Sequence, residues 1–319
     1  MPNPKTGSDL YDPERLYAAA RLYYEENQGQ SEIAQQLQVS RPTVSRMLSQ
    51  AREAGIVQIK VVHPSAHSMD ATSVELAEAL GLNHCYVAPG IQSPNSLGQL
   101  GTGMAPVTRE AIQDMNLQVG DGLVVASGLA MYNVSRMELP TLRGVVISPA
   151  VGGLAEPEPW HQTSEIARTL AQNTGSTYVP LFAGVMPSAP LYAALHEDIA
   201  YQQIKHLWAT AKGALVGIGS KTSGRTSLAS AIPKKALSDA EADICLHFFN
   251  DAGEELSFPG VERTIRIPLE DLRRIPSVAA VAVGDEKVNP IITASATGVL
   301  NSLITDERTA NQILSQLGK

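Results

Sequence analysis

Residues 30–57 read QSEIAQQLQVSRPTVSRMLSQAREAGIV, and this stretch predicts two short helices joined by a tight turn. Apolar side chains recur at helical spacing over 31–37 and again over about 41–54. Ser40 is well placed to cap the second of these helices. Two short helices joined by a tight turn are typical of a helix-turn-helix, which presents the first residues of its second helix to the edges of DNA bases.

The outward positions of the second predicted helix carry side chains that suit DNA. Arg is suited to guanine edges and phosphates, while Ser and Thr bond either phosphates or bases. The residues expected to read or anchor DNA are Ser40, Arg41, Thr43, Ser45 and Arg46. Tyr24, Gln30 and Ser31, from the preceding elements, are candidate phosphate contacts. A surface helical hairpin with a solvated basic face is the alternative interpretation of the same pattern.

A further helix is predicted before this hairpin and a strand after it. Asp12 supplies a cap and Pro13 a first turn, and helical spacing of apolar residues follows them. Residues 56–62 alternate in character like a strand. A helix-turn-helix that runs into such a strand forms a small winged module. Because 63–68 is a polar break and the candidate linker, we expect a DNA-binding domain over residues 1–63.

The charge balance is compatible with one small DNA-reading module. The chain has 319 residues, of which 44% are apolar and 18% are charged, and its net charge is −8. Residues 1–63 hold seven basic and seven acidic side chains, whereas the rest holds seventeen Lys/Arg and twenty-five Asp/Glu. The first segment is therefore basic only relative to an acidic remainder. This distribution argues against a protein coated with nucleic acid along its whole length.

Several protein classes are disfavoured by composition and motif. No apolar run approaches the ~20 residues that cross a bilayer, and the N-terminus lacks the apolar core of a secretory signal. Cys85 and Cys245 stand alone, with no nearby Cys or His cluster to predict a metal site or a disulfide framework. We therefore expect a cytoplasmic protein with no membrane segment, no metal and no cofactor.

Residues 64–319 alternate short β-rich runs with helical stretches, which indicates a doubly wound α/β domain with a parallel sheet covered on both faces. The predicted strands are 122–126, 144–147, 178–181, 214–218 and 278–283, and the predicted helices include 164–172 and 194–208. In such sheets ligands bind beyond the carboxyl ends of the strands.

Two glycine-containing loops and two charges are candidates for a small-ligand site. Ser127 with Gly128, and Gly152 with Gly153, follow apolar strands, so their backbone amides are expected to face a polar ligand. Lys287 offers a point charge with three donors, and an ionised Asp243 accepts hydrogen bonds from sugar hydroxyls. The alternative is that the glycines only form tight turns and that the charges only lie on the surface.

Four blocks of the sequence resemble the SorC family of bacterial sugar-responsive transcriptional regulators. They lie at 30–59, 242–253, 281–287 and 303–310. The resemblance implies a DNA-binding helix-turn-helix joined to a sensor domain that is similar in fold to sugar-phosphate isomerases and deaminases. It also implies that Lys287, in the third block, contacts the effector.

Two positions depart from the family pattern. Asn250 stands where the family usually has Asp. In the family, the loop that corresponds to the one after Gly128 commonly carries a Thr or Ser suited to a phosphate. In this sequence Leu129, Ala130 and Met131 are apolar. The second departure favours an unphosphorylated sugar or polyol over a sugar phosphate as effector.

Three classes of function compete. The first is a regulator of carbohydrate or polyol catabolism that binds double-stranded operator DNA as a dimer or tetramer and responds to a sugar, polyol or sugar phosphate. The second is a sugar-phosphate isomerase or deaminase with an added helical module, which needs an acid/base set. No His is paired with a carboxylate at a convincing spacing, so no catalytic residue is predicted. The third is a structural protein whose hairpin binds protein. The first accounts for both halves of the chain.

Overall fold

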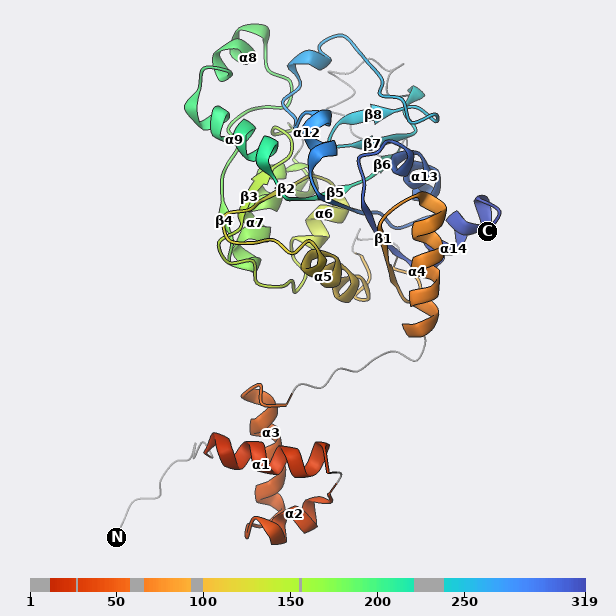
Figure 1. Ribbon diagram of the computed structural model, residues 1–319. Coiled ribbons are helices and arrows are strands. Elements are labelled where there is room, and N and C mark those ends of the chain that lie inside the picture. The colour runs from red at the N-terminus through yellow and green to blue at the C-terminus, as the bar shows by residue number, and fades with distance from the viewer. Residues whose placement is uncertain (1–11, 27, 58–65, 93–99, 155–156, 221–237) are drawn as a thin grey trace. The chain divides into compact units, whose positions relative to one another are not determined.

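Figure 1 shows a computed structural model that describes residues 12–26, 28–57, 66–92, 100–154, 157–220 and 238–319. The chain divides into two units, Met1–Pro64 and Ser65–Lys319. Among the helices described, none is long and apolar enough to cross a membrane.

The N-terminal unit contains three helices whose starts are set by local capping. They are α1 (Pro13–Tyr24), α2 (Gln30–Gln36) and α3 (Arg41–Glu53). Asp12 Oδ1 accepts the Glu14 amide at 3.3 Å, and Ser40 Oγ accepts the Thr43 amide at 3.3 Å. These caps satisfy amide groups that the first turn of a helix leaves without partners. Both predicted caps, and the three predicted helices, are confirmed.

One apolar cluster holds the three helices together. Its buried members are Leu16, Ala19, Ala20, Leu22, Ile33, Ala34, Val44, Met47, Leu48 and Ala51. They include the apolar residues that recur at helical spacing in α3, which are Val44, Met47, Leu48 and Ala51. Tyr23 packs against the cluster, whereas Tyr24 is 37% exposed. Ile56 and Val57 also pack there, but residues 58–62 of the predicted wing strand lie outside the described residues.

The larger unit is built on a seven-stranded parallel sheet in the order β1-β10-β9-β5-β2-β3-β4. Its strands are β1 (His84–Ala88), β2 (Gly122–Val125), β3 (Val146–Pro149), β4 (Thr177–Tyr178), β5 (Gly213–Gly217), β9 (Ser277–Val281) and β10 (Ser302–Asp306). Its helices are α4 (Ala66–Leu80), α5 (Met104–Asp114), α6 (Leu129–Val134), α7 (Thr163–Thr174), α8 (Ala189–Leu195), α9 (Ile199–Thr210), α12 (Leu269–Arg274), α13 (Val288–Ala296) and α14 (Glu307–Gln316). The α/β fold class is confirmed.

The strand order contains a switch point between β2 and β5. From β2 the chain moves outward through β3 to β4, and from β5 it moves the other way through β9 to β10. Because crossovers between parallel strands are right-handed, runs in opposite directions place their helices on opposite faces of the sheet. The crevice outside the carboxyl ends of β2 and β5 is where such a sheet binds ligands.

A small antiparallel sheet follows the switch point. It consists of β6 (Gly219–Ser220), β7 (Ala242–Ile244) and β8 (His247–Phe249), and Figure 1 shows it beside α13. Cys245 and Leu246 form the turn between β7 and β8 with φ values of 50° and 67°. Left-handed backbone at two successive residues is the geometry of a tight hairpin turn, but side chains other than Gly or Asn adopt it at a cost.

The structure corrects several predicted bounds. The single helix predicted over 194–208 is two helices, because the chain breaks at 196–198 and Asp198 caps α9 through the Tyr201 amide at 2.9 Å. The strand predicted from Gly144 begins at Val146, since Gly144 has a φ of 81°. Helix α4 begins at Ala66, inside the predicted linker.

Candidate functional site

The first candidate site is the outward face of α3. Arg41, Ser45 and Arg46 are exposed, and Thr43 is half-buried at the start of the helix. Neither Arg41 nor Arg46 forms an ion pair with a described residue, and the first turn of α3 carries no acidic side chain. The guanidinium groups on this face are therefore available to a negatively charged partner, for which Arg has the right donor geometry.

Ser40 and Thr43 serve the helix as well as any ligand. The two side-chain oxygens lie 2.8 Å apart, and Ser40 Oγ also accepts the Thr43 amide. Thus the residue expected to contact DNA at the start of α3 is also its N-cap. An N-cap hydroxyl is held by the helix it caps, which fixes its direction before any ligand binds.

The three expected phosphate contacts lie at element ends of the same unit. Tyr24 is the last residue of α1, and its ring lies edge-on to that of Tyr23 with centroids 4.9 Å apart. Gln30 and Ser31 form the first turn of α2, where Ser31 is exposed and Gln30 is half-buried. Arg15 Nη2 donates to the Leu37 carbonyl at 3.3 Å and so ties α1 to the end of α2.

The second candidate site lies at the switch point of the sheet. A side chain at Gly217, the last residue of β5, would meet the Ser127 carbonyl oxygen at 3.8 Å. Lys287 Nζ donates to the carbonyl of Ile218 at 2.8 Å, and Asp243 pairs with Gly219 across β6 and β7. Three expected effector residues, from segments far apart in the sequence, therefore meet around residues 217–219.

The glycines of the two expected loops pack closely against neighbouring backbone. A Cβ on Gly152 would come within 2.9 Å of backbone atoms of residues 183–185, so only glycine fits there. The amides of Gly128, Gly152 and Gly153 donate to the carbonyls of Trp160, Ile265 and Ala183, each at 2.8 Å. These three amides were expected to face the ligand. In the structure they hold the loops together instead, and what the glycines provide is close approach of the loops.

Asp243 is buried, with 6% of its surface exposed. Its Oδ2 accepts the Leu246 amide at 3.3 Å, so the carboxylate supports the turn between β7 and β8. Burial lowers the pKa of the nearby Arg266 guanidinium, and the negative charges of Glu255 and Asp243 offset only part of that lowering. Any contact of Asp243 with a ligand would therefore be made by a carboxylate that the surrounding residues hold in place.

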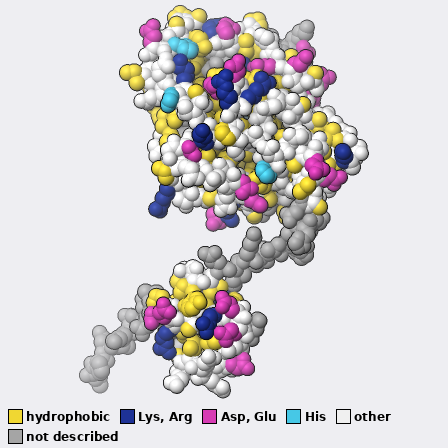
Figure 2. All heavy atoms as spheres, viewed as in Figure 1, with side chains coloured by type: hydrophobic (Ala, Val, Ile, Leu, Met, Phe, Trp, Pro, Cys, Tyr) yellow, Lys and Arg dark blue, Asp and Glu magenta, His cyan; other side chains and the backbone are white. Residues whose placement is uncertain are grey.

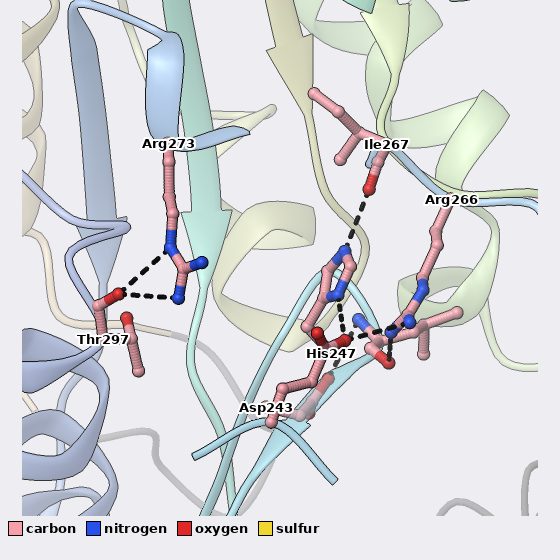
Figure 3. Close-up of polar contacts among 8 residues, drawn as sticks. Asp243, His247, Arg266, Ile267, Arg273 and Thr297 are labelled. Atoms are coloured by element: carbon pink, nitrogen blue, oxygen red, sulfur yellow. Dashed lines mark hydrogen bonds and ion pairs between the residues drawn. The ribbon is translucent and has the colours of Figure 1, made fainter. Parts of the chain in front are cut away.

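A histidine–carboxylate pair that the sequence did not reveal lies beside Asp243. His247 Nδ1 is 2.6 Å from Glu255 Oε1, and His247 Nε2 is 2.9 Å from the Ile267 carbonyl (Figure 3). His247 is 2% exposed, and both of its nitrogens contact acceptors within the chain. The ring is thus occupied by structural hydrogen bonds and has no nitrogen to offer a substrate. The eight-residue separation along the chain gives no periodic signal by which this pair could have been found.

The start of α7 is a further part of the switch-point site that the sequence did not indicate. Residues Pro159–His161 form a short turn before α7, and the Trp160 ring packs edge-on against Tyr132 with centroids 6.4 Å apart. Thr163 is fully buried, and its hydroxyl has no hydrogen-bond partner among the described residues. Because the Trp160 carbonyl accepts the Gly128 amide, this segment lies directly over the loop that follows β2.

A separate groove of about 730 Å³ lies along α14. Gly90, Ile91 and Asp285 line it together with the exposed face of that helix, and Arg308 forms an ion pair with Asp285. None of the predicted site residues lines it. In the part of the chain that the structure describes, no group of His, Cys, Asp or Glu side chains could hold a metal ion.

Comparison with known proteins gives matches over nearly the whole chain. Residues 65–315 match the family model described as "Putative sugar-binding domain". The deoxyribonucleoside regulator of Bacillus subtilis (strain 168) is 31% identical over 309 residues, which cover 94% of this chain and 96% of that protein. The sorbitol operon regulator of Klebsiella pneumoniae is 26% identical over 308 residues, which cover 92% of this chain and 96% of that protein.

Solved structures share the fold. The crystal structure of the full-length sorbitol operon regulator SorC from Klebsiella pneumoniae matches with a TM-score of 0.67 at 24% identity, covering 95% of this chain and 99% of that one. A transcriptional regulator from Streptococcus pneumoniae TIGR4 matches with a TM-score of 0.68 at 21% identity, covering 79% of this chain and 99% of that one.

Proposed function

This chain belongs to the SorC family of sugar-responsive transcriptional regulators, and on that premise we propose that it binds operator DNA with an affinity that a small carbohydrate effector changes. The genes it controls are those of carbohydrate or polyol catabolism. The observation that carries the proposal is that one chain joins a capped helix-turn-helix to a family-typical sugar-binding unit. A sensor and a DNA reader on one chain are what effector-dependent regulation requires.

The chain is a regulator and not an enzyme. Its relatives are named as regulators, and one of them as a transcriptional regulator. The burial and full engagement of His247 agree with this, because a general acid or base must reach the substrate proton.

The DNA site comprises the exposed face of α3 and the adjoining helix ends. Arg41 and Arg46 supply charge and bidentate donors, and Ser45 and Thr43 supply hydroxyls. Ser40, Tyr24, Gln30 and Ser31 contact the phosphates on either side. Apart from the half-buried Thr43 and Gln30, these side chains are exposed. That exposure, together with guanidinium groups that form no ion pair with a described residue, supports this assignment.

The effector site lies at the switch point between β2 and β5. It is formed by Ser127 and Gly128, by Gly152 and Gly153, and by Asp243 and Lys287. Asp243 accepts hydroxyl hydrogens, and Lys287 donates to an oxygen of the ligand. The apolar residues after Gly128 favour an unphosphorylated sugar or polyol. They form the first turn of α6, and so that turn has no Ser or Thr hydroxyl for a phosphate, which supports the preference.

The protein acts in the cytoplasm as a homo-oligomer, a dimer or tetramer. One hairpin makes too few base contacts to select a site in a genome, and two-fold pairing lets two hairpins read repeated half-sites. Phe182, Leu191 and Ile199 of the effector unit are exposed by 78%, 52% and 76%. Figure 2 shows hydrophobic side chains at the surface over α8 and α9, and this is the surface through which we expect two copies to pair.

The test is a mobility-shift titration with the DNA upstream of the protein's own gene, with and without a panel of sugars, polyols and their phosphates. Thermal-shift measurements with the same panel identify the effector class, because a ligand that binds the folded state stabilises it by mass action. A shift of the DNA that one compound abolishes or strengthens is the expected result. Absence of any DNA shift, or the same shift with every compound, would contradict the proposal.

A further inference from the structure

Residues 264–267 run between two walls of the effector site. On one side the segment pairs with the loop that follows β3: the Gly152 amide donates to the Ile265 carbonyl at 2.8 Å, and the Ile267 amide donates to the Ala150 carbonyl at 2.7 Å. Val151 and Arg266 form an antiparallel bridge between these bonds. The backbone of this segment therefore sets where Gly152 and Gly153 lie.

On the other side, the side chain of Arg266 reaches the turn between β7 and β8. Arg266 Nη1 donates to the Leu246 carbonyl at 2.5 Å, and Arg266 Nη2 donates to Glu255 Oε1 at 3.0 Å. The side chain is 10% exposed. A guanidinium group has donors in a rigid planar fork, so it can hold two acceptors at a set separation, which a lysine ammonium cannot do.

The turn that Arg266 holds is under backbone strain. Cys245 and Leu246 are both buried and both left-handed, and neither is a glycine. Such conformations persist only where the surroundings impose them. Leu246 is held through both of its backbone polar groups, since its amide donates to Asp243 Oδ2 and its carbonyl accepts from Arg266. Asp243 and Arg266 thus fix the same residue.

His247 and Glu255 complete the cluster. Glu255 Oε1 accepts from both Arg266 and His247, and His247 Nε2 faces the carbonyl of Ile267, the residue after Arg266 (Figure 3). Arg266 shares this cluster with the carboxylates of Glu255 and Asp243, and its side chain is only 10% exposed, so removing it leaves carboxylate charge uncompensated.

We propose that Arg266 is a positioning residue of the effector site, which couples the carboxylate of Asp243 on the β7–β8 hairpin to the Gly152 and Gly153 loop after β3. It acts through Leu246 and Glu255 rather than by touching the ligand. The β7–β8 hairpin and the loop after β3 then move as one body, and the affinity for the effector depends on the distance between them. The effector part of this inference rests on the proposed function, whereas the coupling of the two walls does not.

The coupling is tested by hydrogen exchange on the full-length chain without ligand. Arg266→Met keeps an unbranched apolar side chain of similar size to the aliphatic part of Arg but removes the two donors that hold Leu246 and Glu255. Amides of 150–153 and 243–249 are expected to exchange together about tenfold faster, while α5 and α14 keep their rates. Arg274→Met is the matched control, because Arg274 is 69% exposed and its ion-pair partners among the described residues are Glu270 and Asp271. Faster exchange in only one of the two segments, or equally throughout the unit, overturns the coupling.

The positioning role is tested by the effector response of the same variants. Mobility shifts use the upstream DNA and a titrated panel of pentoses, hexitols and their monophosphates. Arg266→Met is expected to keep ligand-free DNA affinity within about twofold while the concentration for half-maximal response rises about tenfold, with Arg266→Lys in between. An unchanged half-maximal concentration despite faster exchange overturns the positioning role. If the wild-type chain shifts no DNA, the proposed function fails. The positioning role is then tested by thermal-shift measurements of how tightly the wild type and the variants bind the compounds of the panel.

Discussion

At the scale of single residues, Arg41 and Arg46 are the side chains on which the proposed DNA contact depends most. Arg41→Ala and Arg46→Ala are each expected to weaken operator binding, with about 1–3 kcal/mol of lost discrimination where the contact to a base is bidentate. Fluorescence anisotropy with operator and with scrambled DNA separates the loss of base discrimination from a general loss of DNA affinity. Arg21→Ala is the matched control, since this exposed Arg lies on α1 rather than α3 and pairs with Glu26. If both α3 variants bind like the parent, α3 is not the reading helix.

Lys287 and Asp243 differ in how they are held, and their variants should differ accordingly. Lys287→Met and Asp243→Asn are both expected to abolish the effect of the effector on DNA binding. Only the second should also reduce stability, because Asp243 is buried and accepts the Leu246 amide. Urea unfolding alongside mobility shifts measures both quantities. If DNA binding by both variants still responds normally to the effector, the effector site lies elsewhere in the chain.

Glu255 gives the effector unit a pH dependence. Burial raises the pKa of this carboxyl, but hydrogen bonds and charge attraction from His247 and Arg266 outweigh burial and hold the pKa below 4.5. A lowered folded-state pKa stabilises the fold above the unfolded value, and that stabilisation is lost as the pH falls through the folded pKa. Urea unfolding should therefore show wild type more stable than Glu255→Gln at neutral pH, with the difference shrinking below pH 4.5. A difference independent of pH would contradict the assignment.

At the scale of elements, α3 depends on a cap that is also a proposed DNA contact. Ser40→Ala should destabilise α3 by about 1 kcal/mol, because the Thr43 amide loses its acceptor. Ser40→Asp keeps a capping oxygen but puts a negative charge towards the phosphates, so it should leave α3 stable while weakening DNA binding. Hydrogen exchange of α3 amides and anisotropy with operator measure the two effects. Equal DNA affinity in the Ala and Asp variants would show that Ser40 only caps.

The β7–β8 hairpin is the element whose geometry departs most from local preference. Two successive non-glycine residues with positive φ, both buried, lie between Asp243 and His247. Such a turn is favoured by Asn-Gly or Asp-Gly, whereas this hairpin has Cys245 and Leu246 there. The turn residues alone therefore do not determine its geometry. Its shape comes from the side chains that surround it.

At the scale of the whole molecule, the proposal requires more than one copy. Sedimentation velocity of the wild type should show a dimer or tetramer at micromolar concentration. The double variant Phe182→Glu with Ile199→Glu should sediment as a monomer and lose operator affinity, because it places charges on the exposed apolar surface. Val119→Glu is the control, since Val119 is 83% exposed and lies outside α8, α9 and the 178–182 segment. A wild type that is monomeric with and without operator would contradict oligomeric binding.

The N-terminal helices and the α/β class were predictable from the sequence because their determinants are local. Val44, Met47, Leu48 and Ala51 recur at the spacing of one face of α3. Ser40 lies within three residues of the amide it caps. Neighbouring residues along a helix meet whatever the rest of the chain does. The blocks around Asp243 and Lys287 added a family resemblance, and these charges could be named as candidates before their surroundings were known.

The arrangement of the effector site was decided only by the tertiary structure. Runs of apolar residues predict strands but not their order, so the sequence could not show that β2 and β5 are neighbours at a switch point or that Ser127, Asp243 and Lys287 gather around residues 217–219. The engagement of the Gly152 and Gly153 amides and the cluster of His247, Glu255 and Arg266 were hidden for the same reason. These contacts join segments whose separation along the chain follows no period, and only the packing of the folded chain determines which of them meet.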